Sequence, residues 1–157
     1  PKLSACAANS SWTFLLVFAV FDTLYVKETN DKYTFKVFSS NLNIPVLKLE
    51  NTVCPSLVNE GDLDGNGTTE VGILDTWNTS SCRLYRIYTL QNNKWCYLVP
   101  PLETSESVRA SGFELAESTG IKNRIRVRYA DFEAPLSSCS SSPIKDTIVI
   151  ASFLSIE

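Results

Sequence analysis

The feature that most constrains the fold is a succession of short runs in which apolar and polar residues alternate, each bounded by a polar turn. One turn joins the runs at 23–27 and 33–38, and another joins the runs at 83–90 and 95–99. Alternation without a sustained helical period is typical of strands that bury one face. The sequence therefore predicts an all-β fold of antiparallel hairpins and meanders, with roughly nine to eleven strands.

The length of the chain and the order of these runs indicate how it is divided. A chain of 157 residues suits one domain, which can bury a sizeable core without a metal or a disulfide. We expect residues 1–11 to form an N-terminal tail and residues 12–157 to form a single all-β domain. Within that domain, residues 12–50, 57–99 and 108–154 each match the pattern of one meander.

The two ends of the domain carry its most apolar runs. The run 12–21 stops at Asp22, at about half the length that a membrane-spanning helix needs. Its aromatic and β-branched side chains favour a buried strand, and the hydrophobic region of a signal peptide is the alternative. Residues 147–154 match a final buried strand. We expect these two strands to pair and remove a sheet edge.

Between the meanders, we expect the polar residues 100–111 to form a surface loop.

Composition and charge exclude several classes of function. A net charge of −3 and a pI of about 5.0 provide no field that would hold a nucleic acid. The chain has no histidine, which excludes Ser-His-Asp and Cys-His catalysis and His-ligated zinc. It has no methionine either, so we expect a processed or truncated product. One basic strip alternates along a predicted strand and forms either a solvated face or a site for an acidic glycan or phosphate: Lys122, Arg124, Arg126 and Arg128.

The segment 61–70 carries oxygen-bearing residues at a regular spacing. Side-chain oxygens stand at relative positions 1, 3, 5 and 9, and a backbone carbonyl fills position 7: Asp62, Asp64, Asn66 and Glu70, with Thr68 giving the carbonyl. Ca²⁺ binds about six to eight such oxygens, and Gly65 and Gly67 allow the tight turns between them. The spacing predicts a structural calcium site with these five ligands, and an acidic surface turn is the alternative.

The loop resembles one calcium-binding family more than another. An EF-hand or dockerin loop needs a glutamate at position 12 and flanking helices, but Ile73 occupies that position. The segment is similar to the FG-GAP or integrin α-type repeat, in which a strand enters a D-x-[DN]-x-[DN]-G-x-x-[DE] loop and a second strand leaves it. Glu70 replaces the usual aspartate of that family, and its Phe-Gly and Gly-Ala-Pro motifs are absent.

The resemblance implies that the meanders are similar to propeller blades. Such blades have about 40–45 residues, and a closed propeller typically needs four to eight of them. Three meanders are too few to close a ring. The chain is therefore either a fragment of a larger propeller or a compact assembly of sheets, and we expect the compact assembly.

The cysteines and several short motifs favour an exported protein. Cys6, Cys54, Cys82, Cys96 and Cys139 include no C-x-x-C pair, so we expect at least one disulfide among the last four and Cys6 left over. Residues 3–6 resemble a bacterial lipobox, which would make Cys6 a lipid anchor. The triplets at 22–24 and 146–148 resemble the O-glycosylation motif of exported Bacteroidetes proteins. These features predict a location in the periplasm, on the outer-membrane surface or outside the cell.

Two functional hypotheses remain. The first is an exported, non-catalytic, calcium-stabilised β module that binds a protein or a glycan at the cell surface or in the periplasm, alone or in a larger complex. The second is a carbohydrate-active enzyme or an accessory domain of one. Its catalytic carboxylates would be Asp131 and Glu133, which are two residues apart and would share a strand face, or Asp75 on a rim with Trp77 and Asn78.

Overall fold

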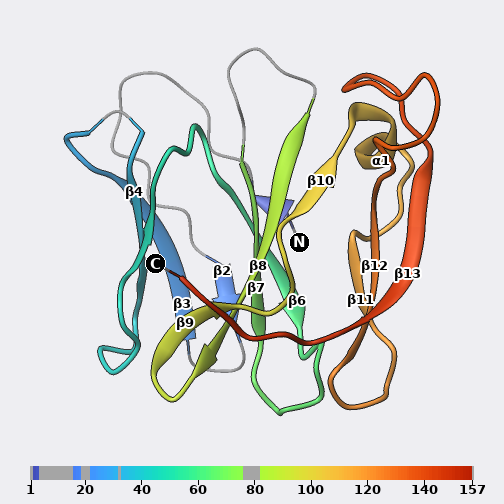
Figure 1. The fold of residues 1–157 in the computed structure, drawn as a ribbon. Coiled ribbons are helices and arrows are strands. Elements are labelled where there is room, and N and C mark those ends of the chain that lie inside the picture. The colour runs from blue at the N-terminus through green and yellow to red at the C-terminus, as the bar shows by residue number, and fades with distance from the viewer. Residues whose placement is uncertain (1, 4–15, 19–21, 32, 76–81, 157) are drawn as a thin grey trace.

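A computed structural model describes residues 2–3, 16–18, 22–31, 33–75 and 82–156 (Figure 1). Of the run 12–21, only Leu16–Phe18 is described, and it is a strand. Cys6, Trp77 and Asn78 lie outside the described residues, and so does most of the expected tail at 1–11.

The described residues are mostly β-structure, with one short helix. No helix among them is long and apolar enough to span a membrane. In chain order the elements are β1 (Lys2–Leu3), β2 (Leu16–Phe18), β3 (Asp22–Glu28), β4 (Phe35–Ser39), β5 (Leu47–Leu49), β6 (Ser56–Gly61), β7 (Glu70–Leu74), β8 (Arg83–Gln91), β9 (Lys94–Tyr97), β10 (Leu102–Thr104), α1 (Glu106–Ala110), β11 (Ala116–Ser118), β12 (Arg124–Ala130), β13 (Ile144–Ile150) and β14 (Leu154–Ser155).

These strands form three antiparallel sheets. The middle sheet has the order β1-β6-β7-β8-β9-β14, with β10 also paired to β8. The N-terminal sheet has the order β2-β3-β4-β5, and the C-terminal sheet has the order β11-β12-β13. Figure 1 shows the N-terminal sheet in blue on one side of the middle sheet and the C-terminal sheet in orange and red on the other. The prediction of an all-β fold is confirmed, and no barrel or propeller closes within the described part of the chain.

The middle sheet separates two hydrophobic cores. The core on the side of the N-terminal sheet includes Leu24, Val26, Val37, Leu47, Leu49, Leu57, Val71, Ile73 and Tyr88. The core on the side of the C-terminal sheet includes Tyr85, Ile87, Leu98, Val99, Ala116, Ile125 and Val127. Alternate residues of a strand point to opposite faces, so a strand covered on both faces needs a continuous apolar run. β7 has such a run, because Val71 and Ile73 join the first core and Leu74 packs against the second.

Gly72 interrupts the run of β7 because the neighbouring strands approach it closely. A Cβ atom at Gly72 would lie 1.9 Å from the Tyr85 hydroxyl oxygen and 2.6 Å from Glu60 Oε1. Tyr85 is almost fully buried and covers this glycine from β8. The glycine is therefore required for packing in the middle of the sheet.

The predicted pairing of the two apolar end strands is wrong. β2 pairs with β3, and β13 pairs with β12. The ends of the chain join the middle sheet instead, because β1 pairs with β6 and β14 pairs with β9. The final strand is also not buried, since Ile148 and Ile150 are 57% and 70% exposed on the outer face of β13.

The expected surface loop at 100–111 contains regular structure. It includes β10 and α1, and the side chains of Thr104, Ser105 and Val108 are buried. Ser105 caps the helix, since its Oγ accepts a hydrogen bond from the Val108 N–H. A single helical turn is too short to show a helical period in the sequence.

The expected disulfide is present. Cys82, immediately before β8, is bonded to Cys139 in the loop between β12 and β13. This bond ties the middle sheet to the C-terminal sheet. Cys54 is also disulfide-bonded, whereas Cys96 is a free, buried thiol.

Candidate metal site

The predicted calcium loop connects two adjacent strands of the middle sheet. β6 ends at Gly61 and β7 begins at Glu70, with a change of register just before Gly61. Gly65 and Gly67 have φ angles of +73° and +87°, a region that side-chain-bearing residues rarely adopt. The two glycines thus permit the path that the sequence predicted for them.

Hydrogen bonds from the backbone hold the first aspartate in place. Asp62 Oδ1 accepts from the N–H groups of Gly65 and Asn66, at 2.8 and 3.0 Å. Asp62 Oδ2 accepts from the Gly67 N–H at 2.9 Å. An aspartate that accepts several backbone N–H groups is characteristic of a tight turn and fixes the loop around its first carboxylate.

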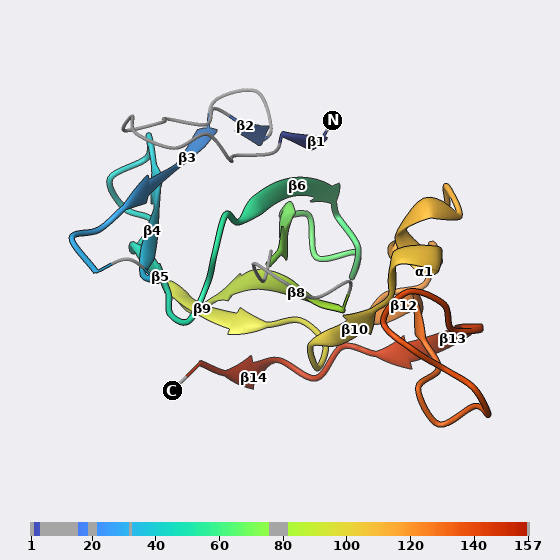
Figure 2. The same cartoon turned by 90° about the horizontal axis from the view of Figure 1, so that it is seen from above.

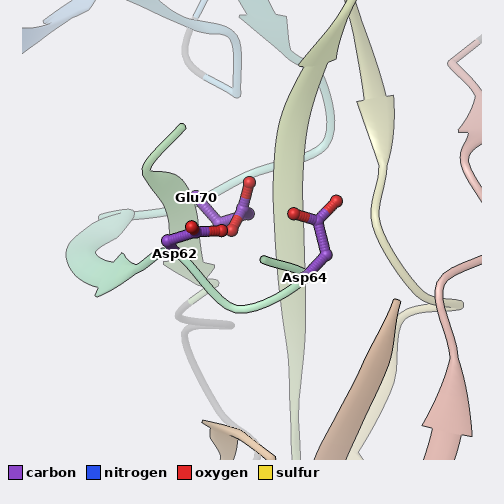
Figure 3. A group of neighbouring side chains, drawn as sticks. All are labelled: Asp62, Asp64 and Glu70. Atoms are coloured by element: carbon purple, nitrogen blue, oxygen red, sulfur yellow. The ribbon is translucent and has the colours of Figure 1, made fainter. Parts of the chain in front are cut away.

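Three carboxyl groups converge within the loop. One oxygen from each of Asp62, Asp64 and Glu70 lies within 4.8 Å of the other two. Figure 3 shows the three carboxyl groups on the same side of the loop. Asp64 and Glu70 are fully buried, whereas Asp62 is exposed. The cluster therefore has one side open to solvent and two members inside the fold.

Burial makes the two inner carboxylates costly to ionise. Burial is the largest cause of the raised pKa of Glu70, which is about 7, and the charges of Asp64 and Asp62 raise it further. Burial also raises the pKa of Asp64, again with a contribution from Asp62. Among the described residues, no Lys or Arg forms an ion pair with any of the three. Crowded carboxylates of this kind are stabilised by a cation.

Glu70 is held by one contact within the loop and by one from a neighbouring strand. Its Oε2 accepts from the Leu63 N–H at 2.7 Å, and its Oε1 accepts from Thr89 Oγ1 on β8 at 3.0 Å. The free thiol of Cys96 on β9 lies nearby, and its pKa is raised by burial and by the charge of Asp64. Thr89 is far from the loop in the sequence, so no local pattern identifies it as a partner of Glu70.

The C-terminal sheet supports the loop from outside. The N–H of Asn123, just before β12, donates to the Asp64 carbonyl oxygen at 2.7 Å. A Cβ atom at Gly65 would lie 3.5 Å from the Cα atom of Lys122. The loop is thus packed between its own strands and the turn that precedes β12.

The other two expected ligands lie in the exposed part of the loop. Asn66 Nδ2 donates to Asp64 Oδ2 at 3.0 Å, and Asn66 Oδ1 accepts from the N–H and the hydroxyl of Thr68. The structure therefore brings together Asp62, Asp64 and Glu70. Ligation by Asn66 and by the Thr68 carbonyl remains a prediction.

The carboxylates of the alternative catalytic hypothesis are placed differently from what was expected. Asp75 is fully buried, forms an ion pair with Arg86 and accepts a hydrogen bond from Thr52 Oγ1, so its expected position on a rim is wrong. Asp131 and Glu133 do not share a strand face either. β12 ends at Ala130, and the two acidic residues lie in the turn that follows, where Asp131 Oδ1 accepts from the Glu133 N–H at 3.3 Å.

The basic strip is partly neutralised by acidic side chains. Arg126 forms two hydrogen bonds with Asp146. Arg128 forms two with Glu117 and another with Asp146. Because Arg126 and Arg128 already bind acidic neighbours, these contacts disfavour a site for an acidic glycan or phosphate. Arg128 is also buried, so the strip is not a uniformly solvated face either.

Comparison with known proteins finds no matching family model, no matching curated protein and no matching solved structure.

Proposed function

We propose that this chain is an exported, non-catalytic β module that is stabilised by calcium and binds a protein or glycan partner at the cell surface or in the periplasm. The observation that carries the proposal is the convergence of Asp62, Asp64 and Glu70. Two of the three carboxylates are fully buried, and no basic side chain among the described residues forms an ion pair with any of them. The resemblance of the loop to the FG-GAP repeat supports the same conclusion.

The donor set favours calcium over other metals. All three side chains offer carboxylate oxygens, which suit a hard cation, and the site has no imidazole. The loop backbone and the exposed Asn66 and Thr68 can supply further oxygens, and water can reach the open side at Asp62. Calcium accepts such irregular sets of six to eight oxygens, whereas Mg²⁺ requires a near-octahedral arrangement.

The position of the site favours a structural role. It joins β6 to β7, and the Asp64 carbonyl oxygen accepts from the Asn123 N–H just before β12, so a bound ion would fix a loop on which the C-terminal sheet packs. The Cys82–Cys139 disulfide connects the same two sheets. Disulfides persist mainly in oxidising compartments, which supports the proposed export.

Calorimetry with Ca²⁺ tests the metal site. Asp64→Asn keeps the shape of the side chain but removes its charge, and we expect it to abolish stoichiometric Ca²⁺ uptake by the chain. Asp131→Asn is the matched control, because Asp131 lies in a turn outside the cluster, and it should bind Ca²⁺ as the unmodified protein does. Equal uptake by all three proteins would place the site elsewhere, and no uptake by the unmodified protein would refute the proposal.

A further inference from the structure

A groove of about 860 Å³ lies between the N-terminal sheet and the middle sheet. One wall is the segment 45–50, which includes β5, and the opposite side is formed by β8, β9 and the chain around β14. Its volume is within the range of about 300–1,000 Å³ that is usual for ligand sites. The groove is separate from the calcium loop, which contributes no residue to its lining.

The groove follows from the unequal widths of the two sheets. The N-terminal sheet ends at β5, whereas the middle sheet extends beyond β9 to one more strand, β14. Figure 2 shows β5 next to the start of β9, with β14 on the far side of β9. β5 pairs with β4 on one side, and no described strand pairs with its other side. Within the described part of the chain, this second edge of β5 is therefore unpaired, and the residues of β5 line the groove.

The floor of the groove is aromatic and incompletely covered. Trp95 and Tyr97 on β9 are half-buried at the border of the first core. The rings of Tyr97 and Tyr88 lie 5.0 Å apart, and Trp95 Nε1 donates to the Pro45 carbonyl oxygen at 2.7 Å. This bond shows that a donor on the middle sheet already reaches the backbone just before β5. The remaining apolar surface can be covered by side chains of an added strand.

The charges beside this edge favour an acidic partner. Cross-strand pairing places Lys27, Lys36 and Lys48 in one row over β3, β4 and β5, and all three are exposed. The row ends at the unpaired edge, where Glu50 pairs with Lys48. Lys94 also lines the groove. Adjacent like charges destabilise a sheet, so a carboxylate next to Lys48 would be stabilising. The lysines would also repel basic strands, and an uncharged strand would gain no attraction from them, which gives selectivity.

The dimensions of the groove suit a short strand. One strand residue occupies on the order of 160 Å³, from spacings of about 3.4 Å along the strand, 4.8 Å between strands and 10 Å between sheets. The groove therefore holds about five residues. Leu47 and Leu49 point into the core and Lys48 points outward. A neighbouring strand would have apolar residues beside the leucines and an acidic residue beside Lys48.

We propose that this groove binds an extended acidic segment of a partner protein, which adds to β5 as a fifth strand of the N-terminal sheet. Main-chain hydrogen bonds to Leu47–Leu49 would provide affinity, and the alternating side chains would provide specificity. This inference rests on the proposed role as a partner-binding module. It does not depend on the presence of calcium, because the groove and the loop share no residue.

A displayed library of random peptides is the probe. Enriched sequences should alternate acidic and apolar residues, and the corresponding synthetic peptides should slow hydrogen exchange at those amides of Leu47–Leu49 that point away from β4. The double charge reversal Lys48→Glu with Lys94→Glu should weaken their binding about tenfold or more, because it reverses two exposed charges in the lining of the groove, one on β5 and one on β9. Lys145→Glu is the matched control, since Lys145 also lies on an edge strand and also pairs with a glutamate, Glu133.

The outcomes separate this inference from the proposed function. Absence of enriched peptides, or peptide binding that survives the double reversal, would overturn the inference. Binding of oligosaccharides from a glycan array in the groove, without peptide binding, would also overturn it but would leave the proposed binding module standing. Asp64→Asn should lose Ca²⁺ uptake and keep peptide binding, and the double reversal should do the opposite, so each failure is recognised by its own assay.

Discussion

The raised pKa of Glu70 predicts an unusual dependence of stability on pH in the metal-free protein. The folded state holds the Glu70 proton up to about pH 7, whereas the unfolded chain releases it near the ordinary glutamate pKa of 4.5. Between these values the unfolded state binds fewer protons than the folded state. The free energy of unfolding must therefore fall as the pH rises from about 5 to about 8, which is the opposite of the behaviour of an ion-paired carboxylate.

The magnitude follows from the size of the shift. A shift from 4.5 to about 7, at about 1.4 kcal/mol per unit, gives roughly 3–4 kcal/mol of stability that is lost as the pH rises past 7. For a domain of this length, that corresponds to a decrease of about 7–14 °C in melting temperature. The raised pKa of Asp64 acts in the same direction. The lowered pKa values of Glu117 and Asp146, caused first by hydrogen bonds from Arg128 and Arg126, affect stability only at more acidic pH.

Urea denaturation at pH 5 and pH 8 in the presence of a chelator measures this effect. The unmodified protein should be less stable at pH 8, and Glu70→Gln should remove most of the difference because the amide has no proton to release in this range. Glu133→Gln is the control, since the Glu133 side chain is 92% exposed. Saturating Ca²⁺ should also reduce the difference in the unmodified protein. Equal stability of the metal-free protein at both pH values, or the same decrease in Glu70→Gln, would refute the reasoning.

Three further predictions concern the metal, the middle sheet and the disulfide. Chelation of Ca²⁺ at pH 7 should lower the melting temperature by about 5–10 °C while the β-type circular dichroism remains, since a site with a Kd one hundredth of the Ca²⁺ concentration contributes about 2.7 kcal/mol. Gly72→Ala should lower the free energy of unfolding, measured by urea denaturation, by about 1–3 kcal/mol, because its Cβ would overlap the Tyr85 hydroxyl. An unchanged free energy of unfolding would contradict the described packing. Replacing Cys82 and Cys139 by alanine should cost roughly 4 kcal/mol, the chain-entropy value for a loop of this length, and an unchanged urea midpoint would show that the disulfide does not constrain the unfolded chain.

Local patterns predicted the parts of the structure that local contacts determine. The hairpin of β8 and β9 follows from alternating side chains and a short polar turn, in which Asn92 and Asn93 adopt positive φ angles. Asp62 and Asp64 were identified from their spacing in one loop, and the structure brings them together with Glu70.

Contacts between distant segments could not be predicted in this way. Thr89 reaches Glu70 only because β8 pairs with β7, and Asn123 reaches Asp64 only because the C-terminal sheet packs beside the loop. The apolar run of β13 predicted a buried strand, but a pattern of isoleucines does not show which strand will be at an edge. In the structure, Ile148 lies opposite Arg126 on the exposed face of the C-terminal sheet.

The order of the strands also has a consequence for how the protein folds. The N-terminal and C-terminal sheets pair strands that are consecutive in the chain, whereas the middle sheet pairs Lys2 with Val58 and Ser155 with Cys96. Contacts between distant residues form slowly, because long loops must close first. We therefore expect the outer sheets to form first and the middle sheet to be completed last by the two ends of the chain. In pulsed hydrogen exchange during refolding, amides of β3, β4 and β12 should become protected before those of β1 and β14.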